Sequence, residues 1–195
     1  MADLVAWTLV QTVSGHGEDL CAREVHVTSD HDAVASGTSA SVRRDLIVAV
    51  VGTRPEAVKM APVVAALRRV PKIRCELCTT GQHDSMVGEV LAAFDLKADH
   101  SLDVMRPGQG LASLTARLLV ELDRMAVTRR PVWIVAQGDT TSVVASSLVA
   151  FYRGIRFGHV EAGLRTGDLR QPFPEELNRR VADLVADAHF APTER

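Results

Sequence analysis

The sequence lacks the features that define several large classes of protein. No apolar run in its 195 residues approaches the roughly 20 residues that a membrane-spanning helix requires. Its formal net charge is −2, so it has no excess of basic residues with which to cover a nucleic acid. The N-terminus carries Asp3 and no basic segment, which argues against a secretory signal. We therefore expect a cytoplasmic protein that binds neither nucleic acid nor a membrane.

Cysteine is scarce as well, with 3 residues, an odd number that does not form a disulfide framework. Such usage is typical of a reducing compartment. Cys75 and Cys78 form a CxxC pair, a pattern found in zinc and thiol-redox sites. The pair lies inside an apparent strand at 73–78, however, and no second CxxC or His pair stands at zinc spacing. We interpret both cysteines as residues packed in a strand.

The composition that remains is that of an ordinary folded domain, with 47% apolar and 24% charged residues. The length is sufficient for one domain with a substantial core. Residues 1–44 show no sustained hydrophobic period, and the Ser- and Gly-containing segment 36–41 is typical of a linker. We expect 1–44 to be a loosely ordered N-terminal extension and 45–195 to form the folded domain.

From residue 45 onward, strand and helix patterns alternate. Leu114, Leu118 and Leu122 recur at four-residue steps, which is typical of an amphipathic helix. The run 132–136 is almost continuously apolar, which favours a central parallel strand. The predicted strands are 45–51, 73–80, 132–137, 155–160 and 188–191, and the predicted helices are 55–70, 83–94, 110–129, 140–152 and 174–186. Repeated βα units predict an α/β fold, a Rossmann-like parallel sheet with helices on both faces.

The first predicted strand ends in the run Gly52-Thr53-Arg54-Pro55, which precedes a helical pattern. Proline is favoured at the first position of a helix, so we predict that this helix opens at Pro55. The free N–H groups of a helix N-terminus attract anions, and Arg54 and Lys59 add two cations nearby. This combination predicts a site for a phosphate-bearing substrate.

Glycines and polar residues also follow three other predicted strands, in the segments 80–84, 138–141 and 161–165. The carboxyl ends of parallel strands lie at one edge of the sheet, where open α/β folds bind their ligands. We therefore expect these segments and the turn at 52–55 to form one site.

Residues 46–195 closely resemble the N-terminal half of the non-hydrolysing UDP-N-acetylglucosamine 2-epimerases. Six segments carry the resemblance, and they occur in the order in which the family has them. They are GTRPEAVKMAP at 52–62, TGQH at 80–83, RPGQGL at 106–111, GDTT at 138–141, HVEAGLRTGD at 159–168 and PFPEELNR at 172–179.

The resemblance implies a glycosyltransferase B-type architecture, with the active site in the cleft between two Rossmann-like domains. It implies interconversion of UDP-N-acetylglucosamine and UDP-N-acetylmannosamine, for cell-envelope polysaccharide precursors. The family reaction eliminates UDP across C1 and C2 to give a 2-acetamidoglucal, then adds it back with the opposite configuration at C2. This route needs no cofactor, neither a metal nor a nicotinamide. The implied partners are the UDP-sugar substrate and either a second copy in a homodimer or a separate C-terminal half.

By the same resemblance, Asp139, Glu161 and Glu175 are the catalytic carboxylates, and Arg54 and Lys59 bind the substrate's diphosphate. These residue types suit the chemistry, because the weakly acidic C2 proton needs a positioned base and the departing UDP needs its charge balanced. The residue types alone do not distinguish which of the three carboxylates removes the C2 proton.

Each carboxylate also has a structural interpretation. Asp139 precedes a predicted helix, and Asp commonly caps helices. Glu175 and Glu176 fall in the first turn of the last predicted helix, where acidic residues interact favourably with the helix dipole. Glu161, taken without the resemblance, is as consistent with an exposed residue after a strand as with a catalytic one.

Four further residues in the matching segments carry no catalytic assignment. We interpret His83 and His159 as histidines at the sheet edge whose hydrogen bonds are satisfied within the fold. Arg165 and Arg179 are either ion-pair partners of the carboxylates or contacts to the substrate.

The family pattern continues through a second domain, whose Gly-His-Arg and Ser-Gly-Gly runs hold the uridine and phosphates. Neither run is in this sequence, so we expect the chain alone to have little or no epimerase activity. Two alternatives are a non-catalytic module that binds a nucleotide sugar or pairs with an intact epimerase, and an epimerase of UDP-diacetamido sugars. The run at 172–176 disfavours a hydrolysing relative.

Overall fold

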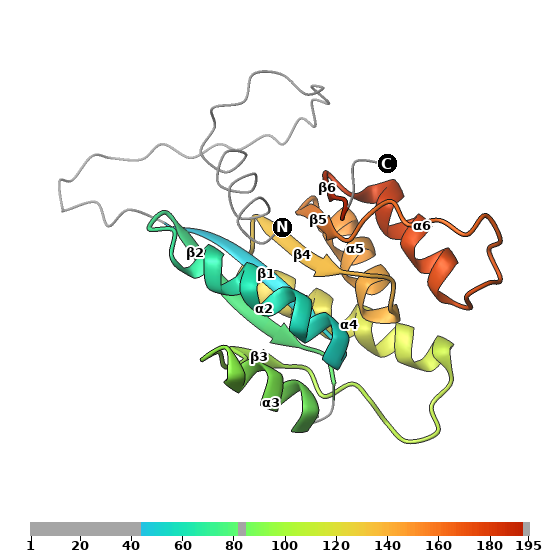
Figure 1. Ribbon diagram of the computed structural model, residues 1–195, viewed down its shortest axis with the longest axis horizontal. Coiled ribbons are helices and arrows are strands. Elements are labelled where there is room, and N and C mark those ends of the chain that lie inside the picture. The colour runs from blue at the N-terminus through green and yellow to red at the C-terminus, as the bar shows by residue number, and fades with distance from the viewer. Residues whose placement is uncertain (1–43, 82–84, 193–195) are drawn as a thin grey trace.

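The structure is a computed structural model that describes residues 44–81 and 85–192. The predicted N-terminal extension lies outside the described residues, apart from Arg44. The strands are β1 (Asp45–Val51), β2 (Ile73–Thr79), β3 (His100–Ser101), β4 (Trp133–Gln137), β5 (Arg156–Val160) and β6 (Ala188–Phe190). The helices are α2 (Arg54–Arg68), α3 (Ser85–Ala93), α4 (Leu111–Arg129), α5 (Thr141–Arg153) and α6 (Glu175–Val185). Figure 1 shows the alternation of the two kinds of element.

The strands form one sheet in the order β3-β2-β1-β4-β5-β6, and every pairing is parallel. This is the strand order of doubly wound Rossmann-type sheets. The predicted Rossmann-like parallel sheet is therefore confirmed. The order also explains the continuous apolar run of β4, since this strand lies between β1 and β5 and all five of its residues are buried.

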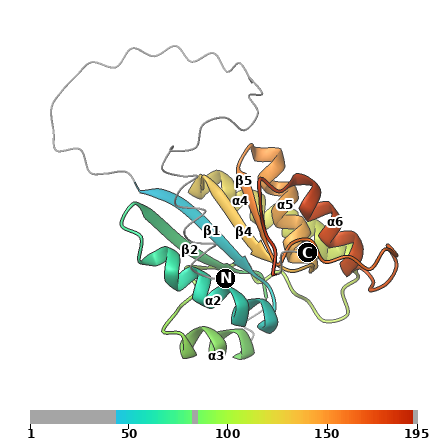
Figure 2. The same cartoon turned by 45° about the horizontal axis from the view of Figure 1, so that its top comes forward.

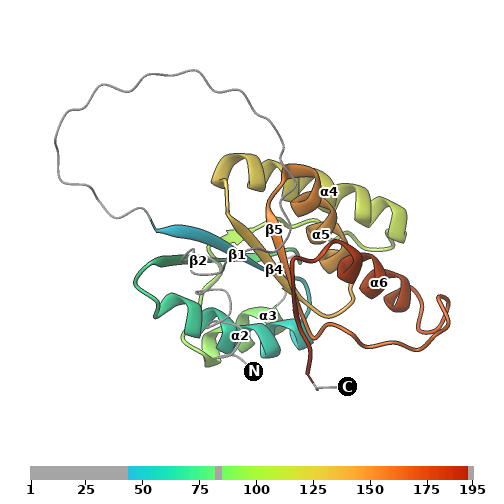
Figure 3. The ribbon, with the colours of Figure 1, turned by 90° about the horizontal axis from the view of Figure 1, so that it is seen from above.

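Helices cover both faces of the sheet, as predicted. α2 and α3 lie on one face, and α4, α5 and α6 lie on the other (Figure 3). Figure 2 shows the same two layers from an intermediate direction. Because successive side chains of a strand point to opposite faces, β1 contributes Ile47 and Ala49 to the first core and Val48 and Val50 to the second.

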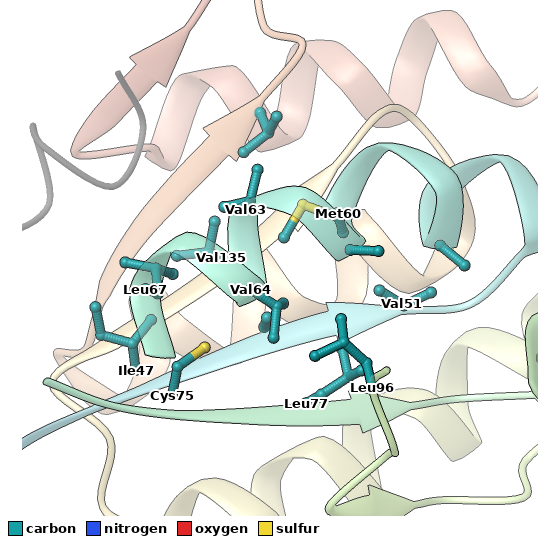
Figure 4. Close-up of a cluster of buried hydrophobic side chains, with 14 of the residues drawn as sticks. Ile47, Val51, Met60, Val63, Val64, Leu67, Cys75, Leu77, Leu96 and Val135 are labelled. Atoms are coloured by element: carbon teal, nitrogen blue, oxygen red, sulfur yellow. The ribbon is translucent and has the colours of Figure 1, made fainter. Parts of the chain in front are cut away.

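The two cysteines of β2 belong to different cores. Cys75 packs beneath α2 beside Leu67 (Figure 4), whereas Cys78 lies in the core on the opposite face with Leu118. Burial raises the pKa of both thiols to about 12. Their side chains cannot meet on one metal or form a disulfide across one face, so the interpretation as packed strand residues is confirmed.

The predicted boundaries differ from the structure by one or two residues at most ends, as expected for helix and strand termini. α2 begins at Arg54 rather than at Pro55, and β2 ends at Thr79. The first two residues of the helix predicted at 83–94 lie outside the described residues. β3 was not predicted, because a strand of 2 residues is too short to show a hydrophobic period.

Two findings bear on function. In the described part of the chain, no helix is long and apolar enough to cross a membrane. Over the same residues, no group of three or more His, Cys, Asp or Glu side chains is placed to hold a metal ion.

Candidate active site

The sheet order reverses at the junction of β1 and β4. β2 and β3 extend the sheet on one side of this junction, and β5 and β6 extend it on the other. Val50 pairs with Ala136 near the carboxyl ends of the two strands, so the turns at 52–53 and 138–140 lie side by side. Ligands of open α/β sheets bind at such a switch point. The sheet thus places the segments 52–55, 138–141 and 161–165, and the described residues 80–81, at one edge.

The turn after β1 is closed by Glu56. Its carboxylate accepts hydrogen bonds from the backbone N–H groups of Gly52 and, at 2.9 Å, of Thr53, the residue that caps α2. Gly52 and Thr53 precede Arg54, the first residue of α2, so Glu56 occupies the N–H groups of the turn, and the anion site at the helix start stays a prediction. The spacing Thr53-x-x-Glu56 is a capping-box pattern, which would have predicted the contact.

Glu56 is buried, with 3% of the residue exposed. Burial raises the pKa of its carboxyl, and the nearby Asp139 adds to this effect against the lowering influence of the Gly52 and Thr53 amides. The Glu56 carboxyl, with its raised pKa, therefore lies against the turn that follows β1.

Gly52 allows three elements to approach one another here. A Cβ atom at this position would lie 2.5 Å from the Ser142 hydroxyl oxygen and 2.8 Å from the Thr80 hydroxyl oxygen. Those two hydroxyls, from the end of β2 and the start of α5, are themselves 2.8 Å apart. Glycine is required because any side chain would displace this pair.

Glu161 is held by two other elements of the sheet edge. The Lys59 Nζ atom, from α2, lies 2.7 and 2.6 Å from its two carboxylate oxygens. The side-chain amide of Gln137, the last residue of β4, donates to the same carboxylate. The backbone of Glu161 has φ 63°, a left-handed conformation that costs a non-glycine residue on the order of 1 kcal/mol. Such strain is common at functional sites.

Asp139 binds α6 from the adjacent turn. Its carboxylate accepts a hydrogen bond from the Arg179 guanidinium, and its backbone oxygen accepts one from the Asn178 amide at 2.8 Å. The residue that caps α5 is Thr140, so the interpretation of Asp139 as the cap of that helix is wrong. Arg179 is thus an ion-pair partner of a candidate carboxylate, one of the two roles predicted for it.

Glu175 and Arg54 stand apart from these contacts. Glu175 is half-buried at the start of α6, and Arg54 is exposed at the start of α2. Within the described residues, neither side chain has a hydrogen-bond or ion-pair partner. The structure therefore brings Asp139, Glu161 and Lys59 into bonded pairs at one edge, and it leaves Glu175 and Arg54 available to other groups.

Glu176 connects α6 to the loop that precedes it, a role that was not predicted from the sequence. Its carboxylate is fully buried and accepts hydrogen bonds from the Thr166 N–H at 3.1 Å and Arg180 Nε at 2.9 Å, with Arg179 at 3.5 Å. Burial would raise the pKa of Glu176, but the Thr166 N–H and the Arg180 guanidinium outweigh it and lower the pKa. The spacing of Glu176 to the two arginines, three and four residues on, could have indicated these pairs.

Unpaired polar atoms gather at the same edge. Four buried side-chain atoms, from α2, the end of β4, the cap of α5 and α6, have no hydrogen-bond partner within the described chain: Glu56 Oε1, Gln137 Oε1, Thr140 Oγ1 and Arg179 Nε. Such atoms are rare in folded proteins and call for an explanation where they cluster. A polar ligand bound at this edge would supply the partners.

A largely apolar cavity of about 670 Å³ lies beside the edge, between the ends of β1 and β2 and helix α3. Gly52, Leu91 and Leu96 are among its lining residues. None of the candidate carboxylates or cations lines it, so the polar chemistry lies at the junction of β1, β4 and β5.

A protein-family model described as UDP-N-acetylglucosamine 2-epimerase matches residues 65–195. The chain belongs to this family. The match covers the turn that carries Asp139, the turn that carries Glu161, and the whole of α6.

Individual epimerases agree with this assignment. The chain is 49% identical over 148 residues to the UDP-N-acetylglucosamine 2-epimerase of Salmonella typhimurium, covering 76% of this chain and 39% of that protein. It is 49% identical over 147 residues to the Bacillus subtilis epimerase, covering 75% of this chain and 39% of that one. The chain thus spans 39% of the length of each of these curated relatives.

Solved epimerase structures share the fold of this chain. The Neisseria meningitidis epimerase bound to UDP-GlcNAc superposes with a TM-score of 0.74 at 44% identity, over 76% of this chain and 40% of that chain. The Methanocaldococcus jannaschii epimerase in complex with UDP-GlcNAc and UDP gives a TM-score of 0.71 at 33% identity, over 76% of this chain and 41% of that chain.

Proposed function

We propose that this chain supplies the N-terminal side of a non-hydrolysing UDP-N-acetylglucosamine 2-epimerase site. The site interconverts UDP-N-acetylglucosamine and UDP-N-acetylmannosamine for cell-envelope polysaccharide precursors. The observation that carries the proposal is the pairing of Lys59 with Glu161 beside the pairing of Arg179 with Asp139, at the switch point of a Rossmann-type sheet. The family membership and the UDP-GlcNAc complexes of two relatives support it.

The proposed reaction has two balanced steps. A carboxylate removes the C2 proton, the C1–O bond to the diphosphate breaks, and the electron pair of the C2–H bond forms the C1=C2 double bond of a glucal. In the second step, a diphosphate oxygen of UDP adds to C1 of the glucal, and a protonated carboxyl group delivers a proton to the opposite face of C2. Two faces of C2 are involved, so the chemistry suits more than one carboxyl group.

Proton transfer at C2 and binding of the diphosphate fall to different residues. Asp139, Glu161 and Glu175 are the proposed catalytic carboxylates. Arg54, which has no partner among the described residues, is the proposed bidentate ligand of the diphosphate. Lys59 holds Glu161 and would bridge this carboxylate to the departing phosphate, so that developing negative charge meets a positioned cation.

The remaining inferences concern location and partners. We infer a cytoplasmic protein, because the sequence has few cysteines. We also infer a protein partner, either a second copy of the chain or a polypeptide that carries the second half of the cleft. The substrate itself is the UDP-sugar.

A chimaera provides the decisive test. Residues 45–195 replace the matching N-terminal segment of the Bacillus subtilis epimerase, to which they are 49% identical over 147 residues. We expect the chimaera to convert UDP-N-acetylglucosamine to UDP-N-acetylmannosamine and to exchange the C2 proton in deuterated water. Asp139→Asn, Glu161→Gln and Glu175→Gln should each lower kcat by about 10²-fold or more. The chain without the second half should show little or no exchange.

Matched controls come from α4. Asp123→Asn and Glu121→Gln remove carboxylates that pair with Arg153 and Arg124 at the surface, in the half of α4 that leads to the amino end of β4. Both should leave turnover unchanged. A folded chimaera without C2 exchange, but with retained UDP-sugar binding, would instead favour a non-catalytic binding module. Release of free N-acetylmannosamine would indicate a hydrolysing enzyme.

A further inference from the structure

His159 is buried in the centre of the sheet edge and contacts two hydrogen-bond acceptors. Its side chain is fully buried, its Nδ1 atom is hydrogen-bonded to Asp183 Oδ1, and its Nε2 atom lies 2.6 Å from the backbone oxygen of Gly138. The prediction that its hydrogen bonds are satisfied within the fold is confirmed. The identity of the two partners goes beyond that prediction.

Both partners accept hydrogen bonds, which fixes the protons of the ring. A carbonyl oxygen can only accept, so Nε2 carries a proton. An ionised carboxylate can only accept as well, so Nδ1 carries a second one. Asp183 is ionised because, although burial would raise its pKa, hydrogen bonds from Arg165 and His159 outweigh burial and lower it. The two contacts therefore suit a ring in which both nitrogens donate.

The charged groups around this ring come from three elements. Asp183 approaches it from α6, and Arg165, from the turn after β5, lies 2.5 Å from the second oxygen of that carboxylate. His189, on β6, lies 4.0 Å from the first oxygen. Phe157 stacks on the ring from β5, with a centroid distance of 6.2 Å. Asp183 is the counter-ion in the centre of this group.

The pair contacts both turns that carry the proposed carboxylates. His159 donates to Gly138, which immediately precedes Asp139 and has φ 87°, a left-handed conformation suited to glycine. Asp183 accepts a hydrogen bond from the N–H of Gly163, in the turn that begins with the left-handed Glu161. One buried ion pair thus fixes two turns of unusual backbone geometry.

We propose that His159, as an imidazolium held by Asp183, is a positioning residue for Asp139 and Glu161. The expected effect on turnover rests on the proposed function, whereas the expected effect on the two turns does not. In structural terms, the Nε2 proton holds the Gly138 carbonyl, while the Nδ1 proton holds Asp183, whose carboxylate accepts a hydrogen bond from the turn after β5. Misplacement of a catalytic group by about 1 Å can cost 10²-fold in rate.

The charge of the ring can be measured on the 195-residue chain itself. Imidazole ¹⁵N NMR at neutral pH should show both nitrogens of His159 protonated. Asp183→Asn should convert the ring to a neutral tautomer with one N–H. Asp187→Asn is the matched control, since Asp187 follows α6 and accepts a hydrogen bond from the Phe157 N–H without contacting His159. A neutral ring in the unmodified chain would overturn the proposal.

Two variants separate positioning from support of the fold. The amide of His159→Gln reaches the place of Nε2 and can still donate to Gly138, whereas that of His159→Asn reaches only the place of Nδ1. In the chimaera, His159→Asn should lower kcat by about 10²-fold and change KM by less than about 3-fold, and His159→Gln should recover about 10-fold of the loss. Equal kcat values for the two folded variants would overturn the proposal.

The backbone gives a readout that does not depend on turnover. The amide resonances of Asp139 and Glu161 in the chain should shift in His159→Asn and return toward their original positions in His159→Gln. If the unmodified chimaera is inactive, the proposed function fails while these resonances still test the positioning role. Unchanged resonances in both variants would refute that role, whatever the activity.

Discussion

Lys59 Nζ lies 2.7 and 2.6 Å from the two carboxylate oxygens of Glu161, across 102 residues of sequence. The contact joins the second turn of α2 to the end of β5, and it crosses the carboxyl end of β4, where Gln137 binds the same carboxylate. One cation therefore connects the predicted diphosphate region to a predicted catalytic acid.

Replacement of Lys59 should affect activity far more than stability. The Lys59 side chain is 49% exposed, so loss of the ion pair should change the free energy of unfolding by less than about 1 kcal/mol. In the chimaera, Lys59→Met should lower kcat/KM by about 10²-fold or more, because the charge that develops on the leaving diphosphate loses its cation. Urea unfolding and initial rates measure the two effects.

Lys72→Met, at an exposed position before β2, is the control and should change neither stability nor kcat/KM. An active Lys59→Met variant would contradict the assignment.

Replacement of Gly52 should expose the close packing at the switch point. In Gly52→Ala, the new Cβ would lie 2.5 Å from the Ser142 hydroxyl oxygen, which should destabilise the chain by about 1–3 kcal/mol. Adding Ser142→Ala should restore part of the loss. Gly88→Ala is the matched control, because its new methyl group would have nothing within 4 Å and alanine is the better helix former. Equal unfolding midpoints for the two alanine variants would contradict the packing argument.

Glu76 should make the fold sensitive to acid. Burial alone would raise its pKa, but hydrogen bonds from Arg129 and His100 and the charges of Arg129 and Arg74 lower it to about 2. An acid whose pKa is lower in the folded chain contributes stability above its unfolded pKa of 4.5, and this is lost as the pH falls toward 2. The stability difference between the native chain and Glu76→Gln should therefore shrink by about 2–3 kcal/mol over that window.

Denaturant unfolding at several pH values measures the effect of Glu76. Glu121→Gln is a suitable control, since Glu121 pairs with Arg124 at the surface and should show little pH-dependent difference. A constant difference between the native chain and Glu76→Gln from pH of about 5 to about 2 would refute the role of this cluster.

Glu56 should act in the opposite sense. Burial raises its pKa above 4.5, so the folded chain binds this proton more tightly than the unfolded chain. The resulting stability is present below the unfolded pKa and is lost as the pH rises through the folded pKa. Glu56→Gln keeps an acceptor oxygen for Gly52 and Thr53 and stays neutral, so it should gain stability relative to the native chain between pH of about 4.5 and 7.

The test of Glu56 uses unfolding at matched pH values. Glu89→Gln, at an exposed position on α3, should differ from the native chain by the same amount at each pH. A native chain that gains stability over Glu56→Gln as the pH rises would show that the Glu56 carboxylate is stabilised, rather than destabilised, by its surroundings.

Local pattern was sufficient to predict most of the elements. The apolar runs of β1, β2, β4 and β5 and the periodicity of α4 are properties of short segments, and the structure confirms them. β3 was missed because its two residues carry no pattern of their own and pair with β2 only in the folded chain. The glycine and polar segments after the strands did indicate one sheet edge, because parallel strands share their carboxyl ends.

The candidate site was predictable as a list of residues rather than as a set of contacts. Asp139, Glu161 and Lys59 were named from the matching segments, but the sequence could not say that Lys59 binds Glu161 or that Arg179 binds Asp139. The structural role of Glu56 was missed, although its capping spacing is local, because the cations beside it indicated an anion site instead. His159 was predicted to be satisfied, yet its partners come from the turn after β4 and from α6.

The sequence by itself determined the alternation of strands and helices, the family, and the residue types available for chemistry, since all of these depend on local order along the chain. The tertiary structure decided which of those residues meet. Lys59 and Glu161, or His159 and Gly138, become neighbours only because the sheet order places β1, β4 and β5 side by side. Burial there also affects the acids in opposite ways: it raises the pKa of Glu56, whereas hydrogen bonds from Arg165 and His159 outweigh burial at Asp183 and lower its pKa.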